Sequence, residues 1–437
     1  MSKILITGVD VAGHYSGLWD AFAKMSFNSD FLLIPNKFSY ARPPPPKSFM
    51  GQIYNFISGK VTFHRTGSKL KFLLFYLCFR LVALIMPFWA ASKYEKIYFI
   101  GGDCFSRTKL EYFLYKKLGI KIYISFHGSD LRPLYLNGME MNSTSTKYLK
   151  ELARRTKNQK KWIQYREKIA DVVLASPSDH QFLSRKDVVN ITLLGNMLNE
   201  TSLREVKSRF SNECSAKEQI KILHCPSNIV GKGSFVIEKI ISELKDNHPE
   251  IELIFAHEKS NPEILQLITE CDFVVDSVWN SSPAGAFPAE AGFLGKPVVI
   301  GSYFSKLKTK IYSGKNVIPP FIFVHPDELS HAIEKLVVDA EYRCNVGRKL
   351  KVYFHEISPP KIVASKYARI LSSGPKRADF FDPKSFSYIH GYGISELQLR
   401  QNLSQYININ GVNALCLEHN SELQKKIEQF VNGCPEF

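Results

Sequence analysis

Short apolar runs alternate with amphipathic stretches along most of the chain. Runs of strand length occur near residues 3–7, 31–34, 96–100, 121–125 and 172–175, and again near 220–223, 251–255, 273–275 and 297–300. Helical patterns occupy the intervals, most clearly at 235–244, 263–268 and 289–294, with another at 363–371. Because strands that alternate with helices form parallel sheets covered on both faces, the pattern predicts a doubly wound α/β protein.

The length and composition fit two such domains. The chain has 437 residues, of which 45% are hydrophobic, as in an ordinary globular protein. The polar stretch at 196–218 is a candidate domain boundary. We therefore expect an N-terminal Rossmann-like domain at 1–200 and a second one at 201–371, followed by an extension at 372–437 in which no motif is recognisable.

The loop after the apolar run at 220–223 carries candidate anion-binding chemistry. It reads HCPSNIVGKGS and precedes the helical pattern at 235–244. Backbone N–H groups at a helix start attract anions, and Lys232 lies inside this loop, where its ammonium could reach a phosphate. An ordinary turn with a solvated lysine is the alternative.

A second loop of small residues lies before the apolar run at 297–300. It reads SSPAGAFP from residue 281 and ends at a helix start beside Glu290. Small residues allow backbone amides to approach a ligand closely. A carboxylate at this place suits a ribose hydroxyl better than a phosphate, so the two loops together indicate a nucleotide site.

The first half also contains loops that follow predicted strands. The glycine-containing loop TGVDVAG includes Gly13 but lacks the GxGxxG spacing of dehydrogenases, so a dinucleotide fingerprint is the weaker interpretation. The run at 121–125 ends in FHGSDLR, which contains His127 and Asp130. Gly102 and Asp103 follow the run at 96–100. Ligand-contacting groups lie at such strand ends, although His127 alone could be a turn histidine capped by Asp130.

Charge is distributed unevenly along the chain. There are 57 Lys and Arg against 41 Asp and Glu, a formal charge of +16. Between Lys147 and Lys168, nine basic residues accompany only Glu151 and Glu167. This segment favours an anionic partner such as a lipid head group, a nucleic acid or a phosphorylated acceptor, with a solvated helix face as the alternative.

An apolar stretch that begins at Phe72 and ends at Ala91 favours the lipid. Twenty helical residues at about 1.5 Å each would span about 30 Å, the thickness of the hydrocarbon layer. Arg80 at its centre and Pro87 near its end oppose a transmembrane span. A crossing here would also separate strands that should share one sheet. We therefore expect a helix partly buried against the sheet and partly in the membrane interface, with a plain core helix as the alternative.

The motifs HCPSN, Lys232-Gly233, DFVVDS and AEAGFLGKPVV resemble those of the donor domain in GT-B glycosyltransferases, especially the retaining family-4-like group. The HGSD turn resembles the same family, and the likeness extends over about residues 1–371. It implies two Rossmann-like domains facing a cleft, with an acceptor domain first and a donor domain second. The sequence departs from the family at Ser227, where an arginine is usual, and near Ser282, where the first of two glutamates is usual.

The resemblance also implies the roles of individual residues. Lys232 would bind the donor diphosphate, Glu290 the ribose and His127 the transferred sugar, and these are the candidate catalytic residues. The candidate donor-binding positions are Ser227, Gly233, Ser282, Gly285, Ala286 and Phe287, and those of the acceptor cleft are Gly13, Gly102, Asp103 and Asp130. No Asp-x-Asp occurs in the chain, so neither a metal nor another cofactor is expected.

The function expected from these features is transfer of a hexose from a nucleotide-sugar to a glycan or lipid-linked acceptor, in bacterial polysaccharide or glycolipid synthesis. Without a signal-peptide pattern at the N-terminus, the expected location is the cytoplasm, peripherally at the inner face of the plasma membrane. A catalytically inactive scaffold of the same fold is one alternative. A nucleic-acid binder is another, disfavoured because basic residues are not interleaved with stacking aromatics.

Overall fold

The computed structural model describes residues 3–34, 46–64, 68–102, 104–141, 143–207, 219–281, 285–306 and 318–433. These residues divide into two compact units. The first comprises Met1–Leu131, Lys161–Asn199 and Pro360–Ser385, and the second Arg132–Lys160, Glu200–Pro359 and Phe386–Phe437. Each unit is therefore made of three separate segments of the chain.

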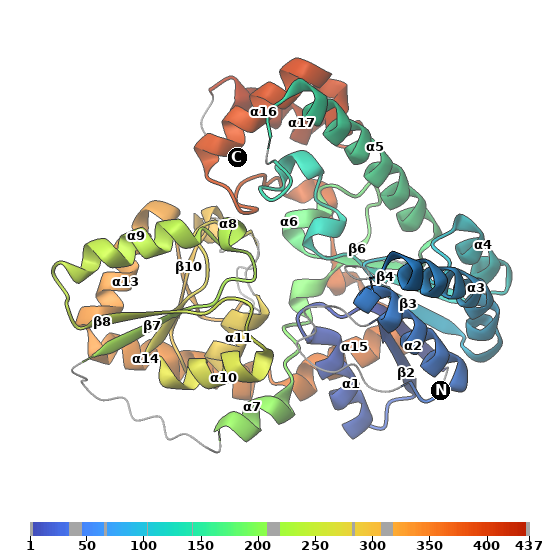
Figure 1. The fold of residues 1–437 in the computed structure, drawn as a ribbon, viewed down its shortest axis with the longest axis horizontal. Helices are drawn as coiled ribbons and strands as arrows, with labels where there is room; N and C mark the ends of the chain where they lie inside the picture. The colour runs from blue at the N-terminus through green and yellow to red at the C-terminus, as the bar shows by residue number, and fades with distance from the viewer. Residues whose placement is uncertain are drawn as a thin grey trace. The chain divides into compact units, whose positions relative to one another are not determined.

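The first unit is built on a seven-stranded sheet of order β12-β6-β5-β4-β3-β1-β2, shown in Figure 1. All neighbouring strands are parallel except β12, which runs antiparallel to β6. The strands are β1 (Ile4–Val9), β2 (Ser29–Ile34), β3 (Lys96–Ile100), β4 (Lys121–Ser125), β5 (Val172–Ala175), β6 (Val188–Asn190) and β12 (Phe380–Phe381). Its helices are α1 (His14–Lys24), α2 (Phe49–His64), α3 (Lys69–Lys93), α4 (Lys109–Lys117), α6 (Pro177–His180) and α15 (Pro360–Ser373).

Alternate residues of each central strand enter opposite cores of this unit. Leu5 of β1 belongs to the core that α3 and α4 cover, whereas Ile4 and Ile6 belong to the core under α1 and α15. Side chains of successive strand residues point to opposite faces, so a sheet buried on both sides needs apolar residues throughout. This explains why the strands appear in the sequence as continuous apolar runs.

The second unit contains a five-stranded, wholly parallel sheet of order β11-β10-β9-β7-β8. The strands are β7 (Ile220–His224), β8 (Ile251–Phe255), β9 (Phe273–Val275), β10 (Val298–Gly301) and β11 (Ile322–Val324). Its helices are α7 (Glu200–Lys207), α8 (Ile229–Lys232), α9 (Ser234–Lys245), α10 (Asn261–Glu270), α11 (Ala286–Phe293), α13 (Leu329–Val338), α14 (Ala340–Val352), α16 (Glu396–Asn410) and α17 (Ser421–Val431). Both units are doubly wound α/β structures, so the predicted fold class is confirmed.

Helix α5 (Thr146–Ile169) begins in the second unit, ends in the first and carries the basic segment. Several of its cations have partners within the molecule: Arg154 pairs with Glu151, and Arg155 pairs with Glu140. The guanidinium of Arg166 lies over the ring of Trp162. Part of the positive charge of this segment is therefore engaged in contacts within the protein. The contact of the segment with a membrane stays a prediction.

The C-terminal extension packs within the second unit. The hydroxyl of Tyr135 donates to the carbonyl oxygen of Leu415 at 2.9 Å, and the amide of Asn410 donates to the carbonyl oxygen of Leu149 at 3.3 Å. Helices α16 and α17 therefore complete a small helical layer with residues 132–160. The sequence indicated no role for this extension, because its contacts are made with segments far away in the chain.

Candidate functional site

Two loops meet where the strand order of the second sheet reverses. Strand β7 lies between β8 and β9, so the connections that leave β7 and β9 depart in opposite directions. Ligands of open α/β sheets bind at such a switch point, beyond the carboxyl ends of the strands. The candidate donor site consists of the segment after β7 at 225–233, the segment after β9 at 276–281, and the start of α11.

The segment after β7 forms a short helix rather than the open loop expected from the sequence. Asn228 caps α8 by accepting the N–H of Gly231, and Lys232 is the last residue of this helix. Gly233 follows with φ +70°, and a β-carbon there would lie 2.7 Å from Cγ2 of Val278. Only glycine fits this backbone and this space, which brings α9 against the segment after β9. Ser227 is exposed beside the short helix.

Lys232 forms an ion pair with a buried aspartate. Its Nζ lies 2.9 Å from both Oδ1 and Oδ2 of Asp276, whose side chain is 1% exposed. Asp276 also accepts hydrogen bonds from Ser277 and Asn280. Burial raises the pKa of the Asp276 carboxyl, but Lys232 together with Ser277 and His224 outweighs burial and holds this pKa below its usual value. The lysine charge is therefore largely balanced before any ligand arrives.

Glu290 is a buried carboxylate with an unused acceptor. It belongs to α11 and is 8% exposed, and its Oε1 accepts a hydrogen bond from the amide of Asn261 at 2.9 Å. Its Oε2 is buried and has no hydrogen-bond partner among the described residues. Burial raises the pKa of Glu290 to about 7. Because a buried polar oxygen without a partner is costly, a ligand hydroxyl that donates to Oε2 would be favourable.

Cys225 links these groups in space. It follows β7, and burial together with the nearby carboxylates of Glu290 and Asp276 raises the pKa of its thiol to about 11, while Lys232 lowers it. The three charged candidates thus lie around one residue at the carboxyl end of β7. The sequence predicted this grouping for Lys232 and Glu290, and the structure adds Asp276.

The small-residue loop leads into α11. Gly285 is the N-cap of this helix, Ala286 is its first residue, and the side chain of Phe287 is buried. Phe287 could therefore offer a ligand its backbone but not its ring. Ser282 lies outside the described residues.

His127 lies in the first unit, just beyond the end of β4. Its Nε2 is 2.8 Å from the hydroxyl of Tyr15, which is 2.9 Å from Oγ of Ser125. Burial lowers the pKa of His127 to about 4, so the imidazole is neutral at physiological pH. The backbone N–H of His127 donates to Oδ2 of Asp130 at 2.8 Å. The capped turn expected as the plain alternative is present, while the ring itself bonds to Tyr15.

Three predicted cleft residues share the carboxyl edge of the first sheet with His127. Gly13 is the N-cap of α1, just beyond β1, and Asp130 caps the turn after β4. Gly102, with φ +70°, follows β3, and a β-carbon there would lie 3.0 Å from Cδ of Arg166. Asp103 lies outside the described residues.

Arg132 and Tyr392 lie beside the candidate donor site, and the sequence did not single them out. The guanidinium of Arg132 lies 3.6 Å from the centre of the Tyr392 ring, and its Nη2 donates to Oγ of Ser281 at 3.3 Å. On either side of Tyr392, β-carbons at Gly391 and Gly393 would lie 3.0 Å from the backbone of Asn280 and Gly231. The segment around Tyr392 thus packs on both donor-site loops. The glycine-bracketed HGYG at 390–393 was the available signal.

Among the described residues, no group of three or more His, Cys, Asp or Glu side chains is placed to hold a metal ion. Within the same part of the chain, α3 alone is long and apolar enough to span a membrane by length and composition.

Comparisons with known proteins give only distant likenesses. No family model matches the chain, and no curated protein is significantly similar to it. Among solved structures, HepE of Anabaena in complex with UDP is 13% identical, with a TM-score of 0.47 over 85% of this chain and 100% of its own. An alpha-glucosyltransferase in complex with UDP and DNA is 10% identical, with a TM-score of 0.46 over 85% and 100%. Starch synthase IV of Arabidopsis thaliana, bound to ADP and acarbose, is 9% identical, with a TM-score of 0.45 over 85% and 99%. Scores at this level carry no argument for function.

Proposed function

We propose that the protein is a retaining glycosyltransferase, of hexosyltransferase type, that moves a sugar from a nucleotide-sugar to a glycan or lipid-linked acceptor. The observation that carries the proposal is Glu290. Its buried Oε2 has no hydrogen-bond partner in the part of the chain that the structure describes. A ribose hydroxyl that donates to this oxygen would supply the missing hydrogen bond. The resemblance of HCPSN and AEAGFLGKPVV to the GT-B donor domain supports the same assignment.

The diphosphate would lie beside Gly233, where α9 begins. The positive end of this 12-residue helix favours an anion. Because Asp276 largely balances the charge of Lys232, a second cation is needed to neutralise the diphosphate. Arg132 would supply it, since its guanidinium donates to Ser281 in the segment after β9. These groups would stabilise the leaving diphosphate without a metal ion.

His127 would contact the transferred sugar. Its neutral imidazole, held by Tyr15, can exchange hydrogen bonds with sugar hydroxyls without an ionic partner. Retention would follow from attack on the same face as the departing group, with the leaving phosphate accepting the proton of the acceptor hydroxyl.

The acceptor and the location are the least constrained parts of the proposal. The exposed apolar surface of α3 supports an acceptor at the cytoplasmic face of the plasma membrane, in bacterial polysaccharide or glycolipid synthesis. A nucleic-acid partner is not proposed. The second candidate is a scaffold that binds nucleotide-sugar without transfer, and it is favoured by Ser227, by Ser282 and by the balanced charge of Lys232.

Thermal-shift measurements with UDP, GDP, ADP, CMP and their sugars, with and without EDTA, test the donor site. We expect stabilisation by one nucleotide family that is insensitive to EDTA, reduced in Glu290→Gln and Arg132→Ala, and kept in Arg154→Ala, which changes an exposed arginine of α5. No shift with any nucleotide would overturn the donor site. Binding without sugar transfer or hydrolysis would favour the scaffold.

A further inference from the structure

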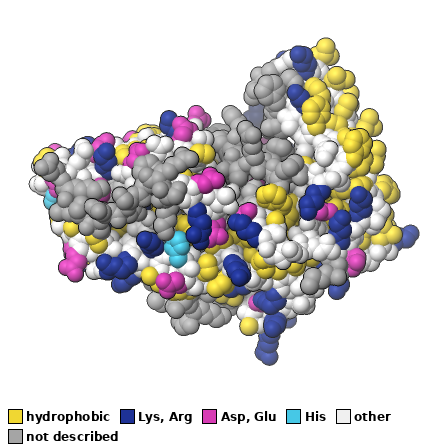
Figure 2. All heavy atoms as spheres, turned by 90° about the horizontal axis from the view of Figure 1, so that it is seen from below, with side chains coloured by type: hydrophobic (Ala, Val, Ile, Leu, Met, Phe, Trp, Pro, Cys, Tyr) yellow, Lys and Arg dark blue, Asp and Glu magenta, His cyan; other side chains and the backbone are white. Residues whose placement is uncertain are grey.

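Helices α2 and α3 form an antiparallel pair whose outer surface is apolar. The large exposed apolar side chains of α3 are Leu70, Leu73, Leu74, Tyr76, Leu77, Leu81, Leu84, Ile85 and Phe88. Among the described side chains of α2 they include Phe49 and Phe56. Most of the α3 residues recur at intervals of three or four and share one stripe of the helix. A helix at the surface of a soluble protein presents polar residues on such a stripe, and large exposed apolar patches mark interaction sites. In Figure 2, hydrophobic side chains gather at the right of the molecule, where α3 lies.

The two halves of α3 have different surroundings. From Phe79 onward, one side of the helix packs against the core of the first unit through residues such as Ala83, Met86 and Ala90. The half before Phe79 contributes no residue to this core and lies beside α2. The second half of α3 therefore anchors the helix pair to the sheet, while the first half of α3 packs only beside α2.

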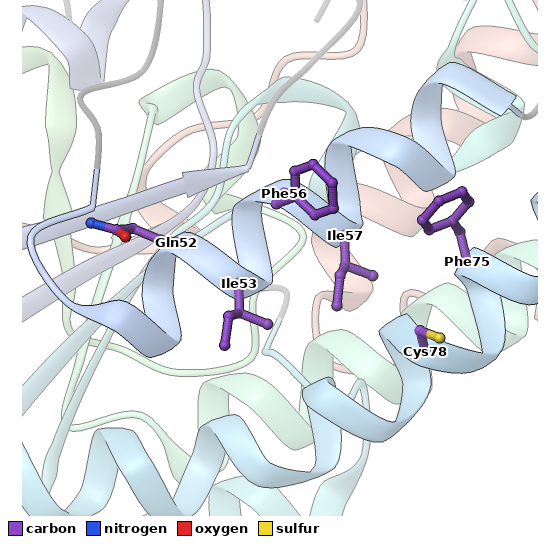
Figure 3. A pocket seen from close by; sticks show the side chains of 6 residues that line it. All are labelled: Gln52, Ile53, Phe56, Ile57, Phe75 and Cys78. Atoms are coloured by element: carbon purple, nitrogen blue, oxygen red, sulfur yellow. The ribbon is translucent and has the colours of Figure 1, made fainter.

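A groove of about 460 Å³ opens between the two helices. Gln52, Ile53, Phe56 and Ile57 of α2 line one side, and Phe75 and Cys78 of α3 line the other, as Figure 3 shows. Apart from the amide of Gln52, these side chains offer carbon and sulfur surface. This lining suits an apolar chain.

The charges around the pair select its partner. Neither helix contains an acidic residue, while Lys60, Lys69, Lys71, Arg80 and Lys93 are basic. In the whole chain, Asp30 and Glu95 are consecutive acidic residues with nine Lys and Arg between them. Two copies of such a surface repel each other, whereas anionic lipid head groups attract it. An anionic bilayer therefore fits better than a second copy of the chain.

Helix α3 cannot span the membrane while the first sheet stays intact. Strand β1 pairs with β3 in parallel, so a single crossing by α3 would place neighbouring strands on opposite sides of the bilayer. A return crossing by α2 would need more than its 16 residues, since these reach only about 24 Å. The pair can lie in the interface but cannot cross.

We propose that the α2–α3 pair inserts its apolar stripe into the interface of an anionic bilayer and that a lipid chain occupies the groove between the helices. The exposed leucines enter the acyl boundary, while the flanking lysines stay at the head groups. This rests on the membrane location in the proposed function and deepens it, by naming the charge of the lipid and the groove that holds its chain. Because it depends only on the surface of the first unit, vesicle binding can fail while sugar transfer is retained, and the reverse.

Flotation of the full-length protein with vesicles tests the insertion without any assay of activity. We expect binding to phosphatidylcholine–phosphatidylglycerol vesicles, at least about tenfold weaker binding to phosphatidylcholine alone, and a similar loss in Leu73→Glu/Leu77→Glu. These leucines are 53% and 54% exposed and lie outside the core, so folding should be retained. Leu397→Glu, at a 67% exposed leucine of α16, should bind like the unmodified protein.

A fluorophore on Cys78 tests the groove. Cys78 is exposed, and labelled Cys78→Ser protein gives the background from the other cysteines. We expect a blue shift on anionic vesicles and quenching by doxyl groups in the middle of the acyl chain. Absence of quenching would overturn the groove assignment. Equal binding by the double-glutamate variant, or a dimer in solution that this variant dissociates, would overturn the membrane assignment.

Discussion

The Nζ of Lys232 lies 2.9 Å from both carboxylate oxygens of Asp276, and this pair joins the end of α8 to the segment after β9. A buried ion pair contributes little as a whole, but removal of one partner leaves a buried charge uncompensated. A truncation of Lys232 would therefore remove this ion pair together with any contact that Lys232 makes in the proposed donor site.

Lys232→Ala is expected to lower the free energy of unfolding by about 3–5 kcal/mol, because the Asp276 carboxylate stays buried without its counter-ion. The sequence presented Lys232 only as a candidate catalytic residue, and the ion pair with Asp276 adds a structural role. Urea denaturation measures the loss. Lys239→Ala, at a 76% exposed lysine of α9, is the control. Equal stability of the two variants would contradict a structural role for the pair.

A double variant tests the charge of Lys232 without leaving an unpaired carboxylate at Asp276. Lys232→Met/Asp276→Asn removes both charges and should recover part of the stability that Lys232→Ala loses. If Lys232 also binds the diphosphate, the double variant should still bind nucleoside diphosphate weakly by calorimetry. Full affinity in the stable double variant would remove Lys232 from the donor site.

The carboxyl of Glu290 should make stability fall as pH rises. Its pKa is raised from 4.5 to about 7 in the folded protein, so folding is progressively disfavoured between these values and the full loss is reached above pH 7. Glu290→Gln should remove this loss and stabilise the protein at pH 8 by up to about 3 kcal/mol. Denaturation at pH 5 and pH 8 measures the difference, with Glu243→Gln on α9 as the control. Equal pH dependence in both variants would contradict the assignment.

The same group should make donor binding depend on pH. A ribose hydroxyl donates to the ionised carboxylate, so affinity should rise by about tenfold between pH 6 and pH 8. A nucleotide-sugar is the suitable ligand, because its diphosphate keeps a constant charge over this range. Binding to Glu290→Gln should be weaker and independent of pH. A flat profile in the unmodified protein would exclude Glu290 from the contact.

Arg132 should contribute to donor affinity through its charge. Loss of a charge-assisted contact to the diphosphate in Arg132→Ala is expected to weaken binding by about tenfold or more. Tyr392→Phe keeps the ring beneath the guanidinium and should bind normally, whereas Tyr392→Leu should resemble Arg132→Ala. Calorimetry with the nucleotide that stabilises the protein measures each value. Unchanged affinity in Arg132→Ala would exclude the arginine.

Acid should destabilise the first unit through its buried histidines. Burial lowers the pKa of His14 to about 3 and those of His127 and His180 to about 4, from 6.5. The stability that their neutral forms provide is complete above pH 6.5 and is lost as pH falls toward 4. Thermal unfolding between pH 7.5 and 4.5 should show a steep decrease, reduced in His180→Gln if that variant folds at pH 7.5. A flat profile would contradict burial of the neutral rings.

Much of the fold was readable because the central strands of each sheet are buried on both faces. The runs at 96–100, 121–125, 172–175, 251–255 and 273–275 coincide with strands of the structure. Shorter or less apolar elements were missed, among them β11 and the edge strand β12, whose pairing with β6 joins distant segments. A strand is recognised in the sequence by a run of apolar residues that the fold buries. An edge strand of two half-buried residues is too short to show such a run.

The sequence by itself determined the alternation of strands and helices, the place of the two donor-site loops and the apolar character of α3, because these depend on side-chain type and local spacing. Tertiary structure alone decided that Asp276 pairs with Lys232, that Oε2 of Glu290 is buried with no partner among the described residues, and that the ring of Tyr392 lies beneath Arg132. Each of these depends on groups tens to hundreds of residues apart in the chain. Distance and burial, which set their energies, exist only once the chain has folded.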